Sequence, residues 1–266
     1  MYRLEREDFV RPRYIALWAL LAFQAGFINT FGYFALGRSV SHVTGFGTQI
    51  GIALAESRLL IAVDLLMFPL FFVLGSFVSA LYTSARIERS RRPSYGRITL
   101  AMPIILFTLM AMGTFGVFGP FGEEFIYNRD FALLFLLAFF CGMQNGCFAT
   151  MTKGQVRTTH LTGVSTDLGT DAARMFFGRL EEEEYALTQR VQISRLATIV
   201  CFASGSILSA QISSVYGYSV LALPFATSAV AYLAARQTSR LLDERLESNL
   251  AEERRARSAI PHPRRV

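Results

Sequence analysis

Two copies of one unusual motif constrain this chain more than any other feature, and they contain two of its three histidines. The first copy, Ser41-His42-Val43-Thr44-Gly45, recurs as Thr159-His160-Leu161-Thr162-Gly163. Matching blocks that contain Asn29 and Asn145 precede the two copies. Blocks with the pattern Phe-x-x-Gly-Ser-x-x-Ser-Ala follow them, at 72–80 and 202–210. Three blocks in the same order predict an internal duplication, and a repeat must be recognised before the fold is assigned.

Long apolar runs predict a membrane protein rather than soluble domains. The run Tyr14–Leu36 contains no formal charge, and as a helix it extends about 34 Å, enough to cross a bilayer. Five comparable runs are Leu59–Tyr82, Ile98–Phe118, Phe131–Met151, Leu196–Val215 and Tyr218–Ala235. Hydrophobic residues make up 52% of the chain and include 24 Phe, which fits six membrane spans.

The basic residues are distributed unequally between alternate loops. Of the 26 Lys and Arg, 23 lie in segments 1–13, 85–97, 152–195 and 236–266, and the other loops hold Arg38, Arg58 and Arg129. Because basic residues accumulate on the cytoplasmic side, both termini are predicted to be cytoplasmic. The net charge of +6 is therefore read as setting the topology. Nucleic acid is not an expected partner, since no aromatic residues interleave with the basic ones.

Each histidine motif is followed by a segment that is unsuited to crossing the membrane. Phe46–Ser57 is apolar over only about a dozen residues, whereas a span needs roughly 20. The second copy carries Asp167, Asp171 and Arg174, which a lipid-facing span would not tolerate. Both segments are predicted to be half-helices, either re-entrant or lying at the interface.

The expected fold class is all-α integral membrane, with six transmembrane helices as a 3+3 inverted repeat and one half-helix in each half. Three crossings per half is an odd number, so the second half enters from the opposite face, as in several transporter folds. The predicted organisation is a cytoplasmic tail at 1–13, membrane repeats at 14–118 and 131–235, an external loop at 119–130 and a cytoplasmic tail at 236–266.

The candidate binding residues come from the duplicated blocks. The substrate-binding set is His42, Thr44, Gly45 and Asn29 in the first copy, and His160, Thr162, Gly163 and Asn145 in the second. Imidazoles that titrate near neutral pH, together with helix N-termini, can hold an anion or a polar solute. In the alternative reading, each histidine caps or ties down its own half-helix, with Thr44 and Thr162 as further candidate N-caps. The two asparagines, with Gln24 and Gln144, can equally hold helices together.

The acidic residues Asp64, Asp167 and Asp171 are candidates for coupling or for lining a vestibule. Asp64 lies near the start of the second apolar run, and its alternative role is to pair with Arg58 or with a loop at the membrane interface. Asp167 and Asp171 share one helix face, which either lines an inner vestibule or meets water. No metal or cofactor is expected, because two histidines without convergent carboxylates or thiolates fall short of a ligand set. The three cysteines lie in apolar runs and are interpreted as packing residues.

One known family shares these motifs. The stretch Ala25-Gly26-Phe27-Ile28-Asn29, Tyr33, the first histidine motif and Gly51 resemble the YoaK-like family of uncharacterised six-span bacterial inner-membrane proteins. The resemblance covers nearly the whole chain, from the first span to the last. In that family the motif typically reads His-Met-Thr-Gly-Asn, and Phe46 replaces the asparagine here. The resemblance implies a multi-pass protein of the bacterial inner membrane and brings no established substrate.

The expected function is a small-solute transporter or permease with its site between the half-helices. Its partners would be the lipid bilayer and an unidentified small polar solute. A re-entrant-helix channel and a non-transporting membrane scaffold are the alternatives. An enzyme is not expected, because the chain offers no nucleophile–base constellation. The sequence leaves open whether the chain forms a homo-oligomer.

Overall fold

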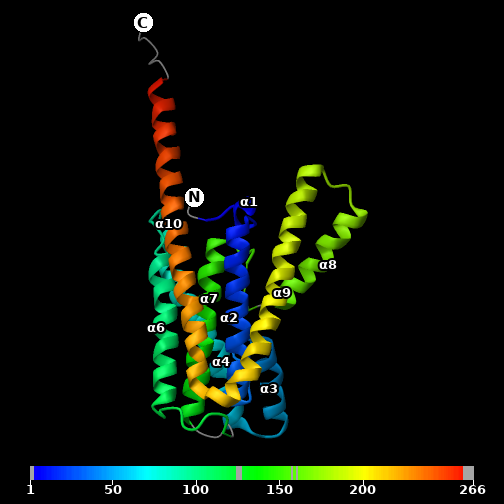
Figure 1. Cartoon of the computed structure of the whole chain (residues 1–266), viewed down its shortest axis with the longest axis vertical. Helices are drawn as coiled ribbons and strands as arrows, with labels where there is room; N and C mark the ends of the chain where they lie inside the picture. Colours follow the sequence, from blue (N-terminus) through cyan, green and yellow to red (C-terminus); the bar gives the residue numbers. More distant parts are fainter. Residues whose placement is uncertain (1–2, 124–127, 157, 160, 260–266) are drawn as a thin grey trace.

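The computed structural model describes residues 3–123, 128–156, 158–159 and 161–259, and this part of the chain is helical, with no strand. The helices in chain order are α1 (Arg6–Phe9), α2 (Pro12–Leu36), α3 (Val43–Ala55), α4 (Leu59–Tyr82), α5 (Ser84–Glu88), α6 (Tyr95–Thr114), α7 (Asn128–Met151), α8 (Leu161–Phe177), α9 (Glu182–Tyr216), the 3-10 helix η1 (Gly217–Leu221) and α10 (Ala222–Ala259). The long helices lie side by side in one bundle (Figure 1).

Among the described residues, five helical segments are long and apolar enough to cross a membrane. Three of them correspond to α2, α6 and α7, and a fourth, Leu59–Glu88, contains α4 and α5. The fifth runs from Glu182 to Thr238 and contains α9, η1 and the first part of α10. Helix α3 is apolar but only 13 residues long, as expected of a half-helix. By the length and composition of its helices, the chain is a multi-pass membrane protein.

The two halves of the chain cross the bundle in opposite senses. Helix α2 starts at the end where α1 lies and runs away from it, whereas α7 runs towards that end (Figure 1). Helix α3 lies beside α4 at the far end, and α8 lies beside α9 nearer the end of α1. The two short helices therefore lie towards opposite ends of the bundle.

The most extensive helix contacts join elements from different halves, α2 with α9 and α4 with α7. Glycines allow the backbones of α2 and α9 to approach closely. A Cβ atom at Gly26 would lie 2.0 Å from the carbonyl oxygen of Phe202, and one at Gly205 would lie 2.0 Å from that of Phe23. Small residues at helix crossings permit this kind of contact in membranes.

Helices α4 and α7 repeat the same contacts at the matched positions. A Cβ atom at Gly142 would lie 1.9 Å from the carbonyl oxygen of Phe72, and one at Gly75 would lie 2.0 Å from that of Phe139. Gly75 and its counterpart Gly205 thus both lie where two helices approach closely. The first block of each half thus packs against the third block of the other half.

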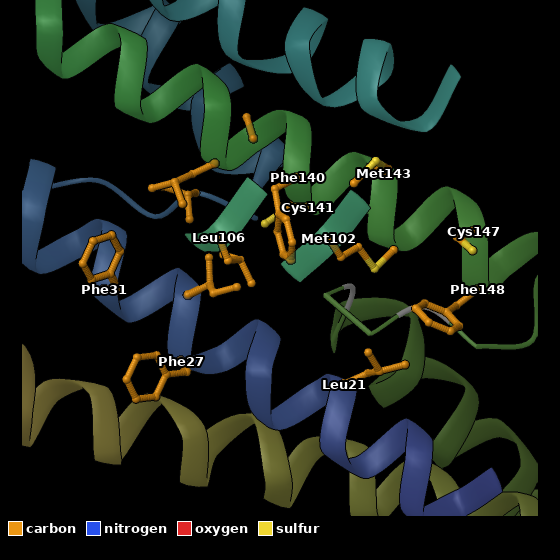
Figure 2. Packing of buried hydrophobic residues seen from close by; sticks show 14 of the residues in the cluster. Leu21, Phe27, Phe31, Met102, Leu106, Phe140, Cys141, Met143, Cys147 and Phe148 are labelled. Atoms are coloured by element: carbon orange, nitrogen blue, oxygen red, sulfur yellow. The ribbon is translucent and has the colours of Figure 1, made fainter. Parts of the chain in front are cut away.

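Large apolar side chains fill the space between α2, α6 and α7 (Figure 2). Phe31 of α2 lies on the side of Leu106 of α6 and Phe140 of α7, whereas Phe27 of α2 points towards α9, and all four side chains are buried. The cysteines of α7 belong to the same cluster and are free thiols. They serve as packing residues, as interpreted from the sequence.

The outer faces of the bundle are also apolar. Helices α4 and α9 expose large side chains along their length, among them Leu60, Leu70, Val200 and Ile207. In water such a surface would cause aggregation, whereas against lipid chains it carries no penalty. These faces are therefore suited to a bilayer.

The expected N-terminal tail is partly packed onto the bundle. Leu4 and Val10 are buried, and the Leu4 N–H donates to the carbonyl oxygen of Met151 at 2.8 Å. The Lys153 ammonium donates to the carboxylate of Glu5 at 2.6 Å. At the other end of the chain, α10 continues well past residue 235, where the apolar run ends.

Candidate functional site

A cavity of about 700 Å³ lies where the two copies of the histidine motif meet. Its walls come from α2, α4, α7 and α9, from the segment that enters α3, and from the starts of α3 and α8. Five pairs of matched positions from the two halves line it: Asn29 and Asn145, Ser41 and Thr159, Val43 and Leu161, Thr44 and Thr162, and Phe72 and Phe202. The duplicated segments therefore converge on a single space.

Most of the predicted binding residues lie at this cavity. Asn29, His42 and Thr44 line it from the first half, and Asn145 and Thr162 line it from the second. Gly45 and Gly163 are not among the lining residues in the described part of the chain. Gly45 instead makes room for the histidine, since a Cβ atom there would lie 2.8 Å from His42 Nδ1. His160 lies outside the described residues.

The two asparagines hold the segments that lead into the half-helices. Asn29 Oδ1 accepts hydrogen bonds from the Ser41 N–H at 3.1 Å and from the Ser41 hydroxyl at 2.9 Å. In the second half, the Asn145 side-chain amide donates to the Thr159 hydroxyl. In both halves the amide thus fixes the residue immediately before the histidine, so these side chains position the motif as well as facing the cavity.

Gln24 and Gln144 act between helices, as one reading of the sequence predicted. Gln24 Nε2 donates to Gln144 Oε1 at 3.0 Å, and both side chains are buried. Gln24 Oε1 accepts from Thr227 at 2.6 Å and from Ser228 at 3.1 Å, which joins α10 to the network. Gln144 Nε2 also donates to the Thr158 hydroxyl at 2.9 Å. This buried network joins α2, α7 and α10 to the segment before α8.

The predicted N-caps are wrong. Helix α3 begins at Val43, which places Thr44 within the first turn, and α8 begins at Leu161, which places Thr162 likewise. In the first half, Asn29 accepts two hydrogen bonds from Ser41, two residues before α3 begins. His42 occupies the N-cap position of α3 but makes no side-chain capping hydrogen bond in the described part of the chain. The capping role for this histidine is therefore also wrong, and its exposed side chain lies at the cavity.

Asp64 does not reach the cavity in the described part of the chain. It is half-buried on α4, near the start of the helix. Arg58, its expected partner, pairs with Glu56 at 3.3 Å. No ion pair joins Asp64 to Arg58 in the described part of the chain, so this alternative is wrong, and the pairing with a loop stays a prediction.

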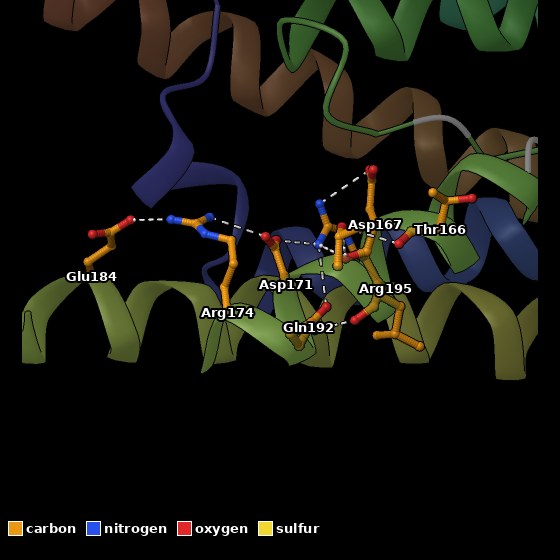
Figure 3. Close-up of polar contacts among 9 residues, drawn as sticks. Thr166, Asp167, Asp171, Arg174, Glu184, Gln192 and Arg195 are labelled. Carbon is orange, nitrogen blue, oxygen red and sulfur yellow. Dashed lines mark hydrogen bonds and ion pairs between the residues drawn. The ribbon is translucent and has the colours of Figure 1, made fainter. Parts of the chain in front are cut away.

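Asp167 and Asp171 bind α8 to α9 and do not line the cavity (Figure 3). The Arg195 guanidinium lies 2.7 Å from the Asp171 carboxylate and 3.3 Å from that of Asp167. The Arg174 guanidinium lies 3.3 Å from the Asp171 carboxylate and 2.8 Å from the Glu184 carboxylate. Burial alone would raise the pKa of Asp171, but hydrogen bonds from the two arginines outweigh it and hold the pKa below its ordinary value of 3.8. The pairs with Arg195 and Arg174 therefore persist at neutral pH and weaken only as the pH falls through this lowered pKa.

Asn29→Ala should destabilise the protein by about 1–3 kcal/mol, because it removes the shared acceptor and leaves the buried Ser41 N–H and hydroxyl unpaired. Ser41→Ala is the matched control. It removes only the hydroxyl and keeps the backbone hydrogen bond, so a smaller loss is expected. Thermal unfolding of the purified variants measures both. Equal melting temperatures for Asn29→Ala and the wild type would show that the asparagine does not hold the motif.

Sequence reasoning did not assign Phe72 and Phe202 to the site. Both line the cavity, beside Pro69 and Ser76 of α4. Their recurrence in the third block was the available signal, but a phenylalanine within an apolar run looks like any other lipid-facing or packing residue. Only the folded arrangement distinguishes them.

A family model described as "protein of unknown function (DUF1275)" matches residues 17–234, a range that extends from α2 into α10. No curated protein and no solved structure matches the chain. The matched family is uncharacterised, in agreement with the resemblance to YoaK-like proteins. The chain belongs to the DUF1275 family.

Proposed function

We propose that this protein is a small-solute transporter whose substrate binds in the cavity between the starts of α3 and α8. The observation that carries the proposal is the lining of one cavity by five matched pairs of residues from the two halves. In transporters built from inverted repeats, substrates bind where discontinuous helices of the two halves meet.

Six crossings in a 3+3 inverted repeat form part of the proposal. The fifth apolar segment includes η1, where the chain reverses between α9 and α10, so these two helices count as separate crossings (Figure 1). The reciprocal glycine contacts support a pseudo-twofold axis that exchanges the α2–α9 pair with the α7–α4 pair. Because α2 and α7 run in opposite directions, this axis would lie in the membrane plane.

The chemistry of the cavity favours solute binding over a scaffold role. Its walls carry hydroxyls, amides and an imidazole beside the rings of Phe72 and Phe202. A scaffold has no need of such a space, since apolar side chains could fill it without leaving polar groups to be satisfied. The volume of about 700 Å³ is typical of a small-molecule site, for which roughly 300–1,000 Å³ is usual. A re-entrant-helix channel is the second candidate, favoured by the short helices at opposite ends of the bundle.

In this proposal the protein is not an enzyme. It lies in the bacterial inner membrane with both termini cytoplasmic, tails at 1–13 and 236–266, and an external loop at 119–130. Reporter fusions after Pro93 and after Asn128 should therefore report opposite sides of the membrane, because basic residues are concentrated on the Pro93 side. The same side for both fusions would contradict the proposed topology.

Reconstituted vesicles test the function directly. They are incubated with a defined mixture of amino acids, sugars, polyols, nucleosides, organic acids and phosphate, and their contents are measured by mass spectrometry. At least one solute is expected to enter only when the protein is present. Ala149→Trp, which places a large ring at the cavity wall, is the matched variant and should block entry. Equal contents in vesicles with the wild type and with this variant would remove the proposed function.

A further inference from the structure

The two half-helices are attached to their neighbours by different chemistry. Helix α3 buries two side chains, Phe46 and Ala53. The Phe46 ring stacks on Phe68 of α4 with 3.5 Å between ring centroids and 9° between the planes. Both rings are almost fully buried. This attachment is apolar and tightly packed.

Helix α8, all of whose residues the structure describes, buries no side chain completely. The positions that match Phe46 and Ala53 are occupied by Val164 and Asp171. The blocks at 72–80 and 202–210 also match the positions just before them, where α4 has Leu65 and Phe68 and α9 has Arg195 and Thr198. Four apolar positions of the first half are thus replaced by smaller or charged residues in the second.

The replacement leaves α8 loosely packed. A small void of about 20 Å³ is lined by Val164, Arg195 and Thr198, at the positions that match the aromatic stack of the first half. The polar contacts that attach α8 to α9 are the ion pairs of Arg195 with Asp167 and Asp171 and that of Arg174 with Glu184 (Figure 3). In addition, Gln192 Nε2 donates to the carbonyl oxygen of Leu168 at 2.7 Å.

The two attachments respond differently to separation. If α3 moved away from α4, the Phe46 and Phe68 rings would lose their packing partners and have to be accommodated elsewhere. If α8 moved away from α9, the charged groups would exchange each other for water. Asp167 and Arg174 are already about half exposed or more, and the largely buried Arg195 and Asp171 would both regain hydration on separation. Separation therefore costs less for α8 than for α3.

We propose that α8 is the moving gate of the cavity and that α3 is its fixed wall. This inference rests on the proposed function, since both helices begin at the cavity, where Thr44 and Thr162 line it. Detachment of α8 from α9 carries Thr162 with it and opens the cavity towards the end of the bundle nearer α8. The first half stays closed because its aromatic stack holds α3 on α4.

Hydrogen–deuterium exchange of the purified full-length protein in lipid nanodiscs tests the gate. In the wild type, amides of α8 should exchange on the order of ten-fold faster than those of α3, since local opening reports local stability. The graft variant takes the residues of the first half into the second: Val164→Phe, Asp171→Ala, Arg195→Leu and Thr198→Phe. This graft variant should slow the amide exchange of α8 to the rate measured for α3. The matched control, Phe46→Val with Phe68→Thr, should accelerate α3 and leave α8 unchanged.

Two single-site results keep the test decisive if the graft does not fold. Arg195→Gln removes the ion pairs of Arg195 with Asp167 and Asp171 and should speed the amide exchange of α8 several-fold. Arg58 lies outside this contact, so Arg58→Gln should leave the exchange of α8 unchanged. Equal exchange of α3 and α8 in the wild type, or an unchanged α8 rate in Arg195→Gln, overturns the gate. If the amides of α8 exchange as expected but no solute enters wild-type vesicles, the movement of α8 is supported and the transport function is refuted.

Discussion

Gly142→Ala should prevent most of the protein from assembling. A Cβ atom at this position would lie 1.9 Å from the carbonyl oxygen of Phe72, a backbone atom that cannot move unless α4 separates from α7. This pair is one of the two most extensive helix contacts in the bundle. The expected destabilisation is about 4 kcal/mol or more, which is exceptional for a single methyl group. Gly26→Ala should behave in the same way, because its Cβ atom would meet the carbonyl oxygen of Phe202.

Gly51→Ala is the matched control for this prediction. Gly51 is also helical, but a Cβ atom there would meet nothing within 4 Å, so alanine should be neutral or slightly stabilising. The monodisperse fraction after detergent extraction and the melting temperature measure all three variants. Wild-type values for Gly142→Ala would mean that the close α4–α7 approach does not exist in the membrane.

The half-helices could be predicted from sequence, but the partners of the long helices could not. The short apolar segment after His42 and the charged one after His160 identify α3 and α8 because span length and charge are local properties. The pairing of α2 with α9 has no local signal apart from the glycines at 26 and 205. The glycines meet backbone carbonyl oxygens of the partner helix. Because every residue type has this carbonyl oxygen, the sequence of the partner helix does not reveal the contact.

Helix α9 extends beyond the apolar run that predicts its membrane span. Its apolar run begins at Leu196, whereas the helix begins at Glu182. Where a helix passes from lipid into water, its apolar run ends but the helix can continue. Hydropathy therefore gives the bounds of the membrane span and not those of the helix. The charged extension holds Glu184 and Arg195, which bind α8.

The site was predicted in part, because duplication identifies residues and not their partners. The recurrence of Asn29 and Asn145 identified both asparagines, but their hydrogen bonds to the residues before the histidines depend on how the chain turns. The spacing of Asp167, Asp171 and Arg174 places Asp171 on a charged helix face and predicts that this face lines a vestibule or meets water. Its partner Arg195 belongs to a different helix, and no spacing rule within one helix predicts such a pair.

His42→Ala should abolish uptake of whichever solute the wild-type vesicles accumulate, while the melting temperature stays close to the wild-type value. His42 lies at the cavity, its side chain is exposed, and it makes no capping hydrogen bond in the described part of the chain. Its removal should therefore cost no more than about 0.5 kcal/mol of stability, as for other exposed residues. The duplication alone predicts the same loss of uptake for His160→Ala.

Thr48→Ala is the control for a general effect on α3, because this exposed residue lies one turn beyond the lining Thr44 and is not itself a lining residue in the described part of the chain. Uptake per folded molecule and melting temperature are measured on the same preparations. Loss of uptake in His42→Ala but not in Thr48→Ala, at an unchanged melting temperature, places the imidazole in contact with the solute. A fall in melting temperature with normal uptake per folded molecule assigns the histidine a structural role. Wild-type uptake in well-folded His42→Ala and His160→Ala would refute the hypothesis that the duplicated histidine motif binds the solute.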